Sequence, residues 1–140
     1  MNAATAAHDS PNRSHDALNV ALWIAQLVLF MVFAMTGIAK ATMPIARLAP
    51  IMAWVTGVSP ALVRFIGVAE LSGALGVLLP TATRVRPELA SLAALGLAIV
   101  MTLATAVNVA TGELAHAPVS LVLGALAAFV AWGRSPVVEA

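Results

Sequence analysis

The sequence predicts an all-α, polytopic membrane protein in which four transmembrane helices form a compact bundle. The first observation is the composition, because 61% of the residues are hydrophobic and only 9% are charged, against about 25% charged residues in ordinary soluble domains. The second is the division of the chain into four apolar blocks, which are separated by prolines and polar residues. A helix that crosses a bilayer needs about 20 mostly apolar residues. Four crossings therefore nearly exhaust the 140 residues and leave no room for a soluble catalytic domain.

One transmembrane domain is predicted over residues 17–134, with a tail at each end. Residues 1–16 are rich in Ala, Asn, Ser and His and lack a continuous apolar face, so they are predicted to be a disordered N-terminal tail. Residues 135–140 are predicted to be a short C-terminal tail. Both tails therefore lie outside the part of the chain that is expected to enter the bilayer.

The first crossing is predicted over residues 17–39. A cleaved signal peptide is the alternative for this block, because "AKA" at 39–41 has the small residues of a cleavage site. The apolar run, however, is longer than the core of a signal peptide, which spans about 7 to 15 residues, and the charged Lys40 lies at the proposed junction. We therefore expect this helix to be retained.

A long connection with several prolines follows the first crossing. Its apolar residues recur at helical spacing, and Trp54 accompanies them. This pattern predicts a short helix that lies in the headgroup region and does not cross the membrane. The residues that carry the pattern are Ile45, Leu48, Met52 and Val55.

The remaining crossings are predicted over residues 63–79, 88–110 and 118–133. Pro80 is predicted to end the second helix, and Pro87 to stand at the start of the third. The second and fourth blocks are short, so these two helices are expected to cross with little tilt or to include flanking residues at the interface, such as Trp132.

Small residues mark the predicted contacts between helices, because lipid tails provide no hydrophobic reason for helices to associate. The third block carries a row of small residues at every fourth position, and another helix is expected to lie against this row. The alternative is that an alanine-rich sequence produces such rows by chance. The row consists of Ala90, Ala94, Ala98, Thr102, Ala106 and Ala110. The predicted packing positions are Gly37, Gly67, Gly73, Gly76, Ala94, Ala98 and Gly124.

Polar side chains inside or next to the apolar blocks identify a candidate site. Consecutive crossings run in opposite directions, so the end of the first and third blocks and the start of the second and fourth lie at one membrane surface. Glu70 lies six residues beyond Arg64 and therefore about 9 Å deeper, at 1.5 Å per residue. The predicted polar cluster comprises Lys40, Arg64, Glu70, Asn108 and His116, with Glu113 nearby.

Two interpretations of this cluster stay open from the residues alone. In the first, Glu70 pairs with Arg64 or Lys40 and links two helices, because charges inside a membrane must be paired. In the second, the polar groups line a cavity that binds a small headgroup, such as a quinone carbonyl, or handles a proton. No metal site is predicted, because one plausible histidine and scattered carboxylates lack the spacing of metal ligands.

Other classes of function are excluded by composition. The net charge is only +1 and no Lys/Arg run is long, so nucleic-acid binding is not expected. The chain has no cysteine, so it cannot form a disulfide, a thiolate metal site or a dithiol relay. Any redox chemistry would therefore be supplied by a partner.

Four stretches resemble the DoxX-like family of small four-helix membrane proteins, over about residues 20–134: "FAMTGIAKA", "GVSPALVRFIGVAELSGALGVLLP", "LAALGLAIVMTLATAVNVATGE" and "AFVAWGR". The distinctive parts are the G-x-x-K ending of the first helix and the R-x-x-G-x-x-E run of the second, which contains Arg64, Gly67 and Glu70. The resemblance implies a bacterial plasma-membrane protein. Some relatives are small subunits of a thiosulfate:quinone oxidoreductase, and others are linked to oxidative-stress complexes. Asn108 stands where many relatives have a histidine, and an amide cannot titrate.

Three functional hypotheses follow from different classes. The first is a non-catalytic membrane subunit or scaffold that partners a redox enzyme, and under it the isolated chain is not an enzyme. The second is an oxidoreductase subunit with a pocket for a quinone or another small ligand at Lys40, Arg64 and Glu70. The third is a small transport or permeation element. No covalently bound cofactor is expected, no catalytic residue is assigned, and a homo-oligomer is a further hypothesis.

Both termini are predicted to lie in the cytoplasm. The opposite side has Lys40, Arg47 and Arg64. If Lys40 and Arg64 belong to the polar cluster inside the bundle, only Arg47 remains in a loop on that side. The terminal side then has more basic loop residues, which the positive-inside rule associates with the cytoplasm. The basic residues of the terminal side are Arg13, Arg84, Arg86 and Arg134.

Overall fold

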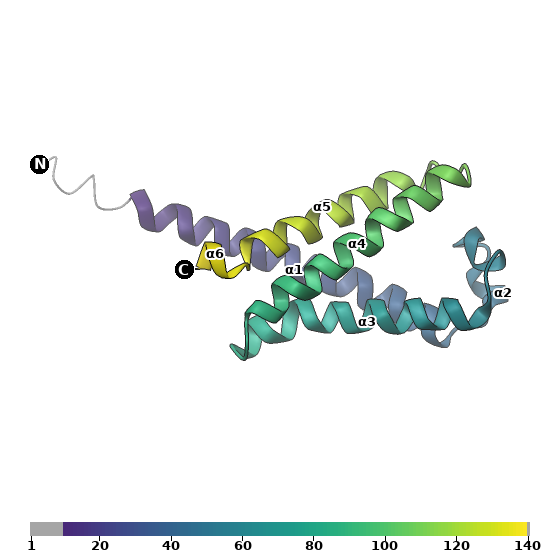
Figure 1. Cartoon of the computed structure of the whole chain (residues 1–140), viewed down its shortest axis with the longest axis horizontal. Coiled ribbons are helices and arrows are strands. Elements are labelled where there is room, and N and C mark those ends of the chain that lie inside the picture. Colours follow the sequence, from purple (N-terminus) through teal and green to yellow (C-terminus); the bar gives the residue numbers. More distant parts are fainter. Residues whose placement is uncertain (1–9, 140) are drawn as a thin grey trace, which may run out of the picture.

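The computed structural model describes residues 10–139, which form four long helices and three short helical segments (Figure 1). No β-strand occurs over this range, so the predicted all-α bundle is confirmed. The long helices are α1 (Ser10–Thr42), α3 (Pro60–Thr83), α4 (Glu88–Ala110) and α5 (Ala117–Gly133). The short segments are α2 (Ile45–Leu48), the 3-10 helix η1 (Ala53–Thr56) and α6 (Pro136–Glu139).

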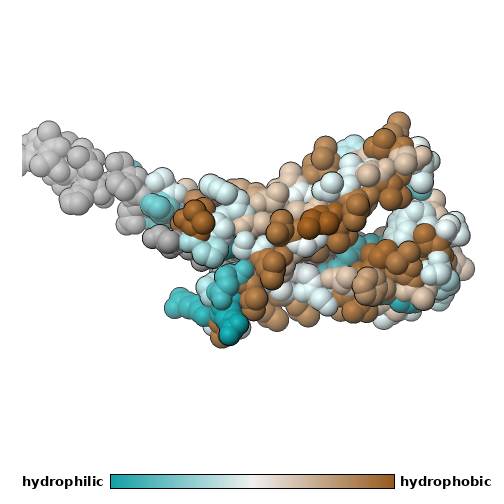
Figure 2. Space-filling view, viewed as in Figure 1, coloured by the Kyte–Doolittle hydropathy of each residue, from teal (hydrophilic) through white to brown (hydrophobic). Residues whose placement is uncertain are grey.

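The surface of the bundle suits a bilayer. Among the described residues, α1, α3 and α4 are long and apolar enough to cross a membrane, and α5 is a shorter apolar helix of 17 residues. Large hydrophobic side chains are exposed along the helices, and Figure 2 shows them as brown patches, while hydrophilic residues gather at the turn between α3 and α4. Helices satisfy their own backbone polar groups, so apolar side chains can face lipid. The chain is therefore a multi-pass membrane protein.

The four long helices form two hairpins that diverge toward one end. Helix α1 packs along α3, and α4 packs along α5. Figure 1 shows the α4–α5 hairpin rising away from the α1–α3 hairpin toward the end where α2 lies, whereas the two hairpins meet near α6. The main hydrophobic core lies where they meet, and its members include Leu22, Leu29, Phe33, Val77, Leu97 and Val130.

Helix α1 begins seven residues earlier than predicted. Residues 10–16, which were assigned to the disordered tail, are helical, and the rest of that predicted tail lies outside the described residues. The Ser10–Pro11 pair accounts for the early start, because proline is tolerated in the first turn of a helix and its fixed φ favours helix initiation. At the other end, the predicted C-terminal tail contains the short helix α6.

The prediction that Pro80 ends the second crossing is wrong. Helix α3 starts at Pro60, with the Ser59 hydroxyl accepting a hydrogen bond from the Leu62 amide, and it continues through Pro80 to Thr83. A proline has no N–H and disturbs the preceding turn of the helix. In that turn, the Val77 carbonyl accepts a hydrogen bond from Gln26 Nε2 of α1 at 2.6 Å. The carbonyl that loses its helical donor at Pro80 is that of Gly76, so the Gln26 bond ties the disturbed turn to α1 without replacing the missing hydrogen bond.

The connection between α1 and α3 contains two one-turn helices in place of the single short helix that was predicted. Pro50 follows the first of them and cannot extend it, because a proline has no N–H to donate to the carbonyl four residues earlier. The pattern still identified the inward-facing residues, since Leu48 and Val55 are buried. They pack with Val63 of α3 in a small second core, which fixes the connection against the start of α3.

Glycines allow α1 and α3 to approach closely at the end where the hairpins diverge. A Cβ atom on Gly37 would lie 2.8 Å from the Gly67 carbonyl oxygen, and one on Gly67 would lie 2.7 Å from the Ala41 amide nitrogen. Real Cβ atoms do not come so close to backbone atoms. At the contacts with α4, the facing pairs are Gly73 with Leu97, Gly76 with Ala93, and Gly124 of α5 with Met101.

The small-residue row of α4 is only partly covered, contrary to the expectation that a helix lies along all of it. Ala90 and Ala94 are fully buried and Ala98 is half-buried, but Thr102, Ala106 and Ala110 are exposed. A step of four residues turns about 400° around a helix of 3.6 residues per turn, so the row drifts by about 40° at each step. Because of this drift and the divergence of the hairpins, the second half of the row does not face α3.

Candidate functional site

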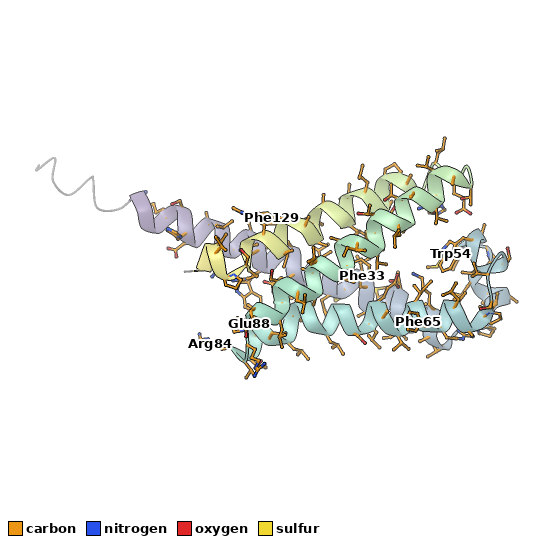
Figure 3. All side chains as sticks on the ribbon, viewed as in Figure 1. Phe33, Trp54, Phe65, Arg84, Glu88 and Phe129 are labelled. Carbon is orange, nitrogen blue, oxygen red and sulfur yellow. The ribbon has the colours of Figure 1, made fainter. Side chains whose placement is uncertain are left out.

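A cavity of about 750 Å³ lies between the diverging hairpins. Helices α1 and α3 form one wall, α4 and α5 form the other, and η1 lies at the end of the cavity. Figure 3 shows Trp54 on η1 directed into the space between the hairpins. The lining is mostly apolar and includes Phe33, Trp54, Ile66, Met101, Val107 and Leu123.

An ion pair lies in the wall that α1 and α3 form. Lys40 Nζ lies 2.6 Å from Glu70 Oε1, and both residues are buried. The Thr36 hydroxyl lies 3.2 Å from the other carboxylate oxygen, Oε2. The Lys40 ammonium also lies 5.7 Å from the centre of the Trp54 ring, within the range of a cation–π contact. Because all four residues line the cavity, a buried ion pair with an adjacent hydroxyl and aromatic ring borders its apolar interior.

The close approach of the helices produces this pair. The Gly37–Gly67 contact places the end of α1 directly against α3, and the Lys40 Cβ atom packs on Gly67. Glu70 lies one turn from Gly67 on the same face of α3, so the lysine reaches it without leaving the helix interface. The sequence analysis gave Lys40 and Arg64 as alternative partners of Glu70, and the structure selects Lys40.

Arg64 contacts α1 instead of Glu70. Its Nη1 donates to the carbonyl oxygens of Lys40 and Met43, each at 2.6 Å. These carbonyls stand at the C-terminal end of α1, where four C=O groups lack helical partners and basic side chains are favourable. Arg64 does not line the cavity. It therefore holds the end of the helix that carries Lys40.

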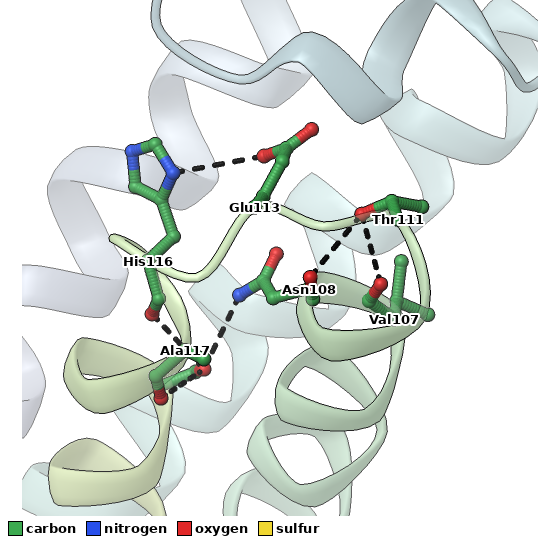
Figure 4. A network of polar contacts seen from close by, with 7 residues as sticks. Val107, Asn108, Thr111, Glu113, His116 and Ala117 are labelled. Atoms are coloured by element: carbon green, nitrogen blue, oxygen red, sulfur yellow. Dashed lines mark hydrogen bonds and ion pairs between the residues drawn. The ribbon is translucent and has the colours of Figure 1, made fainter.

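Asn108 and Ser120 link α4 to α5 in the opposite wall of the cavity. Asn108 Nδ2 lies 3.3 Å from Ser120 Oγ, and the Thr105 hydroxyl lies 3.0 Å from the same oxygen (Figure 4). Ser120 Oγ is also 3.1 Å from the Ala117 carbonyl oxygen. Asn108 and Ser120 are both buried, and both line the cavity.

His116 and Glu113 lie in the turn between α4 and α5, at the mouth of the cavity. His116 Nδ1 lies 3.6 Å from Glu113 Oε2 (Figure 4). The His116 side chain is 59% exposed, so it resembles an ordinary interfacial group. The structure thus brings Lys40, Glu70 and Asn108 into the walls and leaves His116 at the entrance.

Three residues of the site were not identified from the sequence: Thr36, Trp54 and Ser120. Thr36 precedes Lys40 by one helical turn, so helix geometry could have placed it on the same face. Trp54 was predicted to accompany a helix in the headgroup region. Their positions depend on how the hairpins diverge, for which the sequence contains no direct signal.

A second polar cluster, here termed the terminal cluster, lies where the hairpins meet. Arg134 Nε donates to Gln26 Oε1 and Arg134 Nη1 to Asn19 Oδ1, each at 3.0 Å. The guanidinium lies 5.6 Å from the centre of the Trp23 ring. Gln26 in turn donates to the Val77 carbonyl, so this cluster ties α1 to α3 and to the residue that follows α5. Arg134 is one of the basic residues that were counted on the terminal side, and it is buried.

The described part of the chain shows no group of three His, Asp or Glu side chains that could hold a metal ion. Comparison with known families matches residues 24–130 to the DoxX-like family. The match covers both walls of the cavity, from Lys40 through Glu70 to Asn108 and Ser120. The resemblance in sequence is thus confirmed, and the chain belongs to the DoxX-like family. No curated protein and no solved structure matches it.

Proposed function

We propose that this protein binds a lipid-soluble molecule with a polar ring, of the quinone class, and that it does so as the membrane subunit of a redox enzyme. The observation that carries the proposal is the Lys40–Glu70 pair in the wall of a large apolar cavity. Pockets for small ligands commonly measure about 300 to 1,000 Å³ and combine apolar walls with a few convergent polar groups. The cavity has both properties.

The polar groups of the wall fit a ring that bears oxygen atoms. An ammonium group has three N–H donors. Glu70 accepts one of them, and Lys40 lines the cavity, so it can donate another to a carbonyl or hydroxyl oxygen. The Trp54 ring borders the same space and offers a flat surface for stacking.

The role as a subunit rests on what the chain itself can supply. Without cysteine it can form neither a dithiol relay nor a thiolate metal site. A redox-enzyme subunit bound to it would therefore deliver or accept the electrons. Purification in mild detergent should recover a stable complex with such a partner. Isolation of the chain alone under several mild conditions would count against the subunit role and would leave the binding proposal intact.

The orientation proposed is cytoplasmic termini in a bacterial plasma membrane. Arg134 is buried in the terminal cluster, so it is not counted among the basic loop residues on the two sides of the membrane. The exposed residues Arg13, Arg84 and Arg86 still outnumber Arg47 on the opposite side. A fluorescent reporter fused at the C-terminus should be active in the cytoplasm, whereas an active periplasmic phosphatase fusion would reverse the orientation.

Trp54 provides a direct test of binding, because the other two tryptophans lie near the terminal cluster. A variant with Trp23→Phe and Trp132→Phe keeps Trp54 as its sole tryptophan. In phosphatidylcholine nanodiscs, its fluorescence should be quenched saturably by menadione, a small quinone; the chain has no thiol with which menadione could react. The matched control keeps Trp132 and carries Trp23→Phe and Trp54→Phe. Equal, non-saturable quenching in both proteins would contradict the proposal.

A further inference from the structure

We infer that Asn108 determines the specificity of the cavity and selects a ring that carries a hydroxyl group, as a hydroquinone or a phenol does, over one that carries only carbonyl oxygens. The inference rests on the proposed function, because it concerns the ligand of the same cavity. The geometry that carries it is the orientation of the Asn108 amide, which its neighbour Ser120 fixes.

The hydroxyl hydrogen of Ser120 has backbone acceptors within reach. Ser120 Oγ lies 3.1 Å from the Ala117 carbonyl oxygen and 3.3 Å from the His116 carbonyl oxygen. A carbonyl oxygen can only accept, so the Ser120 hydroxyl must be the donor in either bond. Ser120 Oγ is then left to accept from its side-chain neighbours.

This arrangement decides which end of the amide faces Ser120. Asn108 Nδ2 lies 3.3 Å from Ser120 Oγ and donates to it, which fits a serine oxygen whose own hydrogen is directed to a backbone carbonyl. The carbonyl oxygen Oδ1 is therefore the atom on the other side of the amide, as Figure 4 shows. No donor within residues 10–139 forms a hydrogen bond with Oδ1, although Asn108 is only 8% exposed. Because Asn108 lines the cavity, a ligand can supply the missing donor.

The two walls thus present complementary groups. Lys40, on the α1–α3 hairpin, can only donate, whereas Asn108 Oδ1, on the α4–α5 hairpin, can only accept. Glu70 is an acceptor too, but its Oε1 already pairs with Lys40, and its Oε2 lies 3.2 Å from the Thr36 hydroxyl, which is also 3.0 Å from the Val32 carbonyl oxygen. A hydroxyl group can accept from Lys40 and can donate to Asn108. A carbonyl oxygen can only accept, so a ligand with carbonyls alone covers Oδ1 without pairing it.

Ser120 acts on the ligand through Asn108 and is therefore a positioning residue. Ser120→Ala removes the acceptor that holds Nδ2, so the amide becomes free to turn either its oxygen or its nitrogen toward the ligand. This variant should keep binding but lose much of the preference for a hydroxyl. Ser120→Thr retains the hydroxyl and should restore the preference.

The preference can be measured by calorimetry in phosphatidylcholine nanodiscs under anaerobic conditions. The probes are menadione, its reduced form menadiol, and menadiol dimethyl ether, which has no hydroxyl hydrogen. The native sequence should bind menadiol about tenfold more tightly than the other two, as expected when a buried amide oxygen is otherwise left unpaired. Asn108→Leu should make the three affinities equal. The matched control Thr102→Val removes an exposed hydroxyl of α4 that does not line the cavity, and it should leave the ratio unchanged.

The outcomes separate the two proposals. Saturable binding of menadione and menadiol with equal affinity would overturn the role of Asn108 and leave the proposed function standing. No saturable binding of any probe would overturn the proposed function itself. If Asn108→Leu does not fold, Ser120→Ala and Ser120→Thr still decide the question, because both retain Asn108. An unchanged preference in Ser120→Ala would contradict the positioning role.

Discussion

The two ends of the bundle each contain a buried cation, but the two cations differ in what surrounds them. Arg134 lies where the hairpins meet, and its partners Gln26 and Asn19 come from a helix packed beside it. Lys40 lies where the hairpins diverge, and its pair with Glu70 borders a cavity of about 750 Å³. Burial of a charge inside a membrane protein therefore indicates a site only when the packing around it also leaves space.

The largest effect on stability is expected from Lys40→Met. The change strands the Glu70 carboxylate, which is 2% exposed, and breaking a buried ion pair on one side costs about 3 to 5 kcal/mol. The second change Glu70→Gln, made in the Lys40→Met background, should restore part of the loss. Thermal unfolding in detergent, followed by tryptophan fluorescence, measures all four members of this cycle. Additive losses would contradict the pairing.

A smaller loss is expected from Arg134→Met. It leaves Gln26 Oε1 buried without its donor, which costs about 1 to 3 kcal/mol. The loss should add to that of Lys40→Met, because the two clusters share no partner and lie at opposite ends of the bundle. The menadione affinity of the folded Arg134→Met protein should equal that of the native sequence. Weakened binding would show that the two ends do not have separate roles.

The sequence allowed the fold and part of the site to be predicted. Apolar block lengths identified the helices, and helix geometry with antiparallel crossings placed Lys40, Glu70 and Asn108 at one end. The burial of Arg134 was not predicted, because the residue follows the last apolar block and its partner Gln26 is 108 residues distant in sequence. The divergence of the hairpins was not predictable, because predicted close contacts such as Gly37–Gly67 join α1 to α3 within one hairpin and do not determine its angle to α4 and α5.

The close helix contact at the cavity end can be tested by substituting glycines with alanine. Gly67→Ala places a Cβ atom 2.8 Å from the Gly37 carbonyl oxygen, and such overpacking costs about 1 to 3 kcal/mol. Gly96→Ala is the matched control, because a Cβ at Gly96 meets nothing within 4 Å and alanine stabilises a helix interior by about 0.5 to 1 kcal/mol. Thermal unfolding in detergent should therefore show opposite shifts. Equal shifts would contradict the contact.

The smallest effect is expected from Arg64→Met. The guanidinium is half-buried, and its loss removes two hydrogen bonds to the end of α1, so we expect a decrease of about 1 kcal/mol. The loss should be smaller than that of Lys40→Met, because no carboxylate is stranded. The same unfolding assay compares the two variants. A larger loss for Arg64→Met would reverse the assignment of Lys40 as the partner of Glu70.

The most direct test of the difference between the two ends is the menadione affinity of the double variant Lys40→Met/Glu70→Gln. This protein is expected to fold, because neither partner of the ion pair is left charged, and it retains the apolar walls of the cavity. Saturable quenching of Trp54 in the single-tryptophan background gives the dissociation constant. We predict that the constant rises by about tenfold or more, since the ligand loses a charged donor, while Arg134→Met leaves it unchanged. An unchanged constant in the double variant would contradict the assignment of the Lys40–Glu70 end as the binding site.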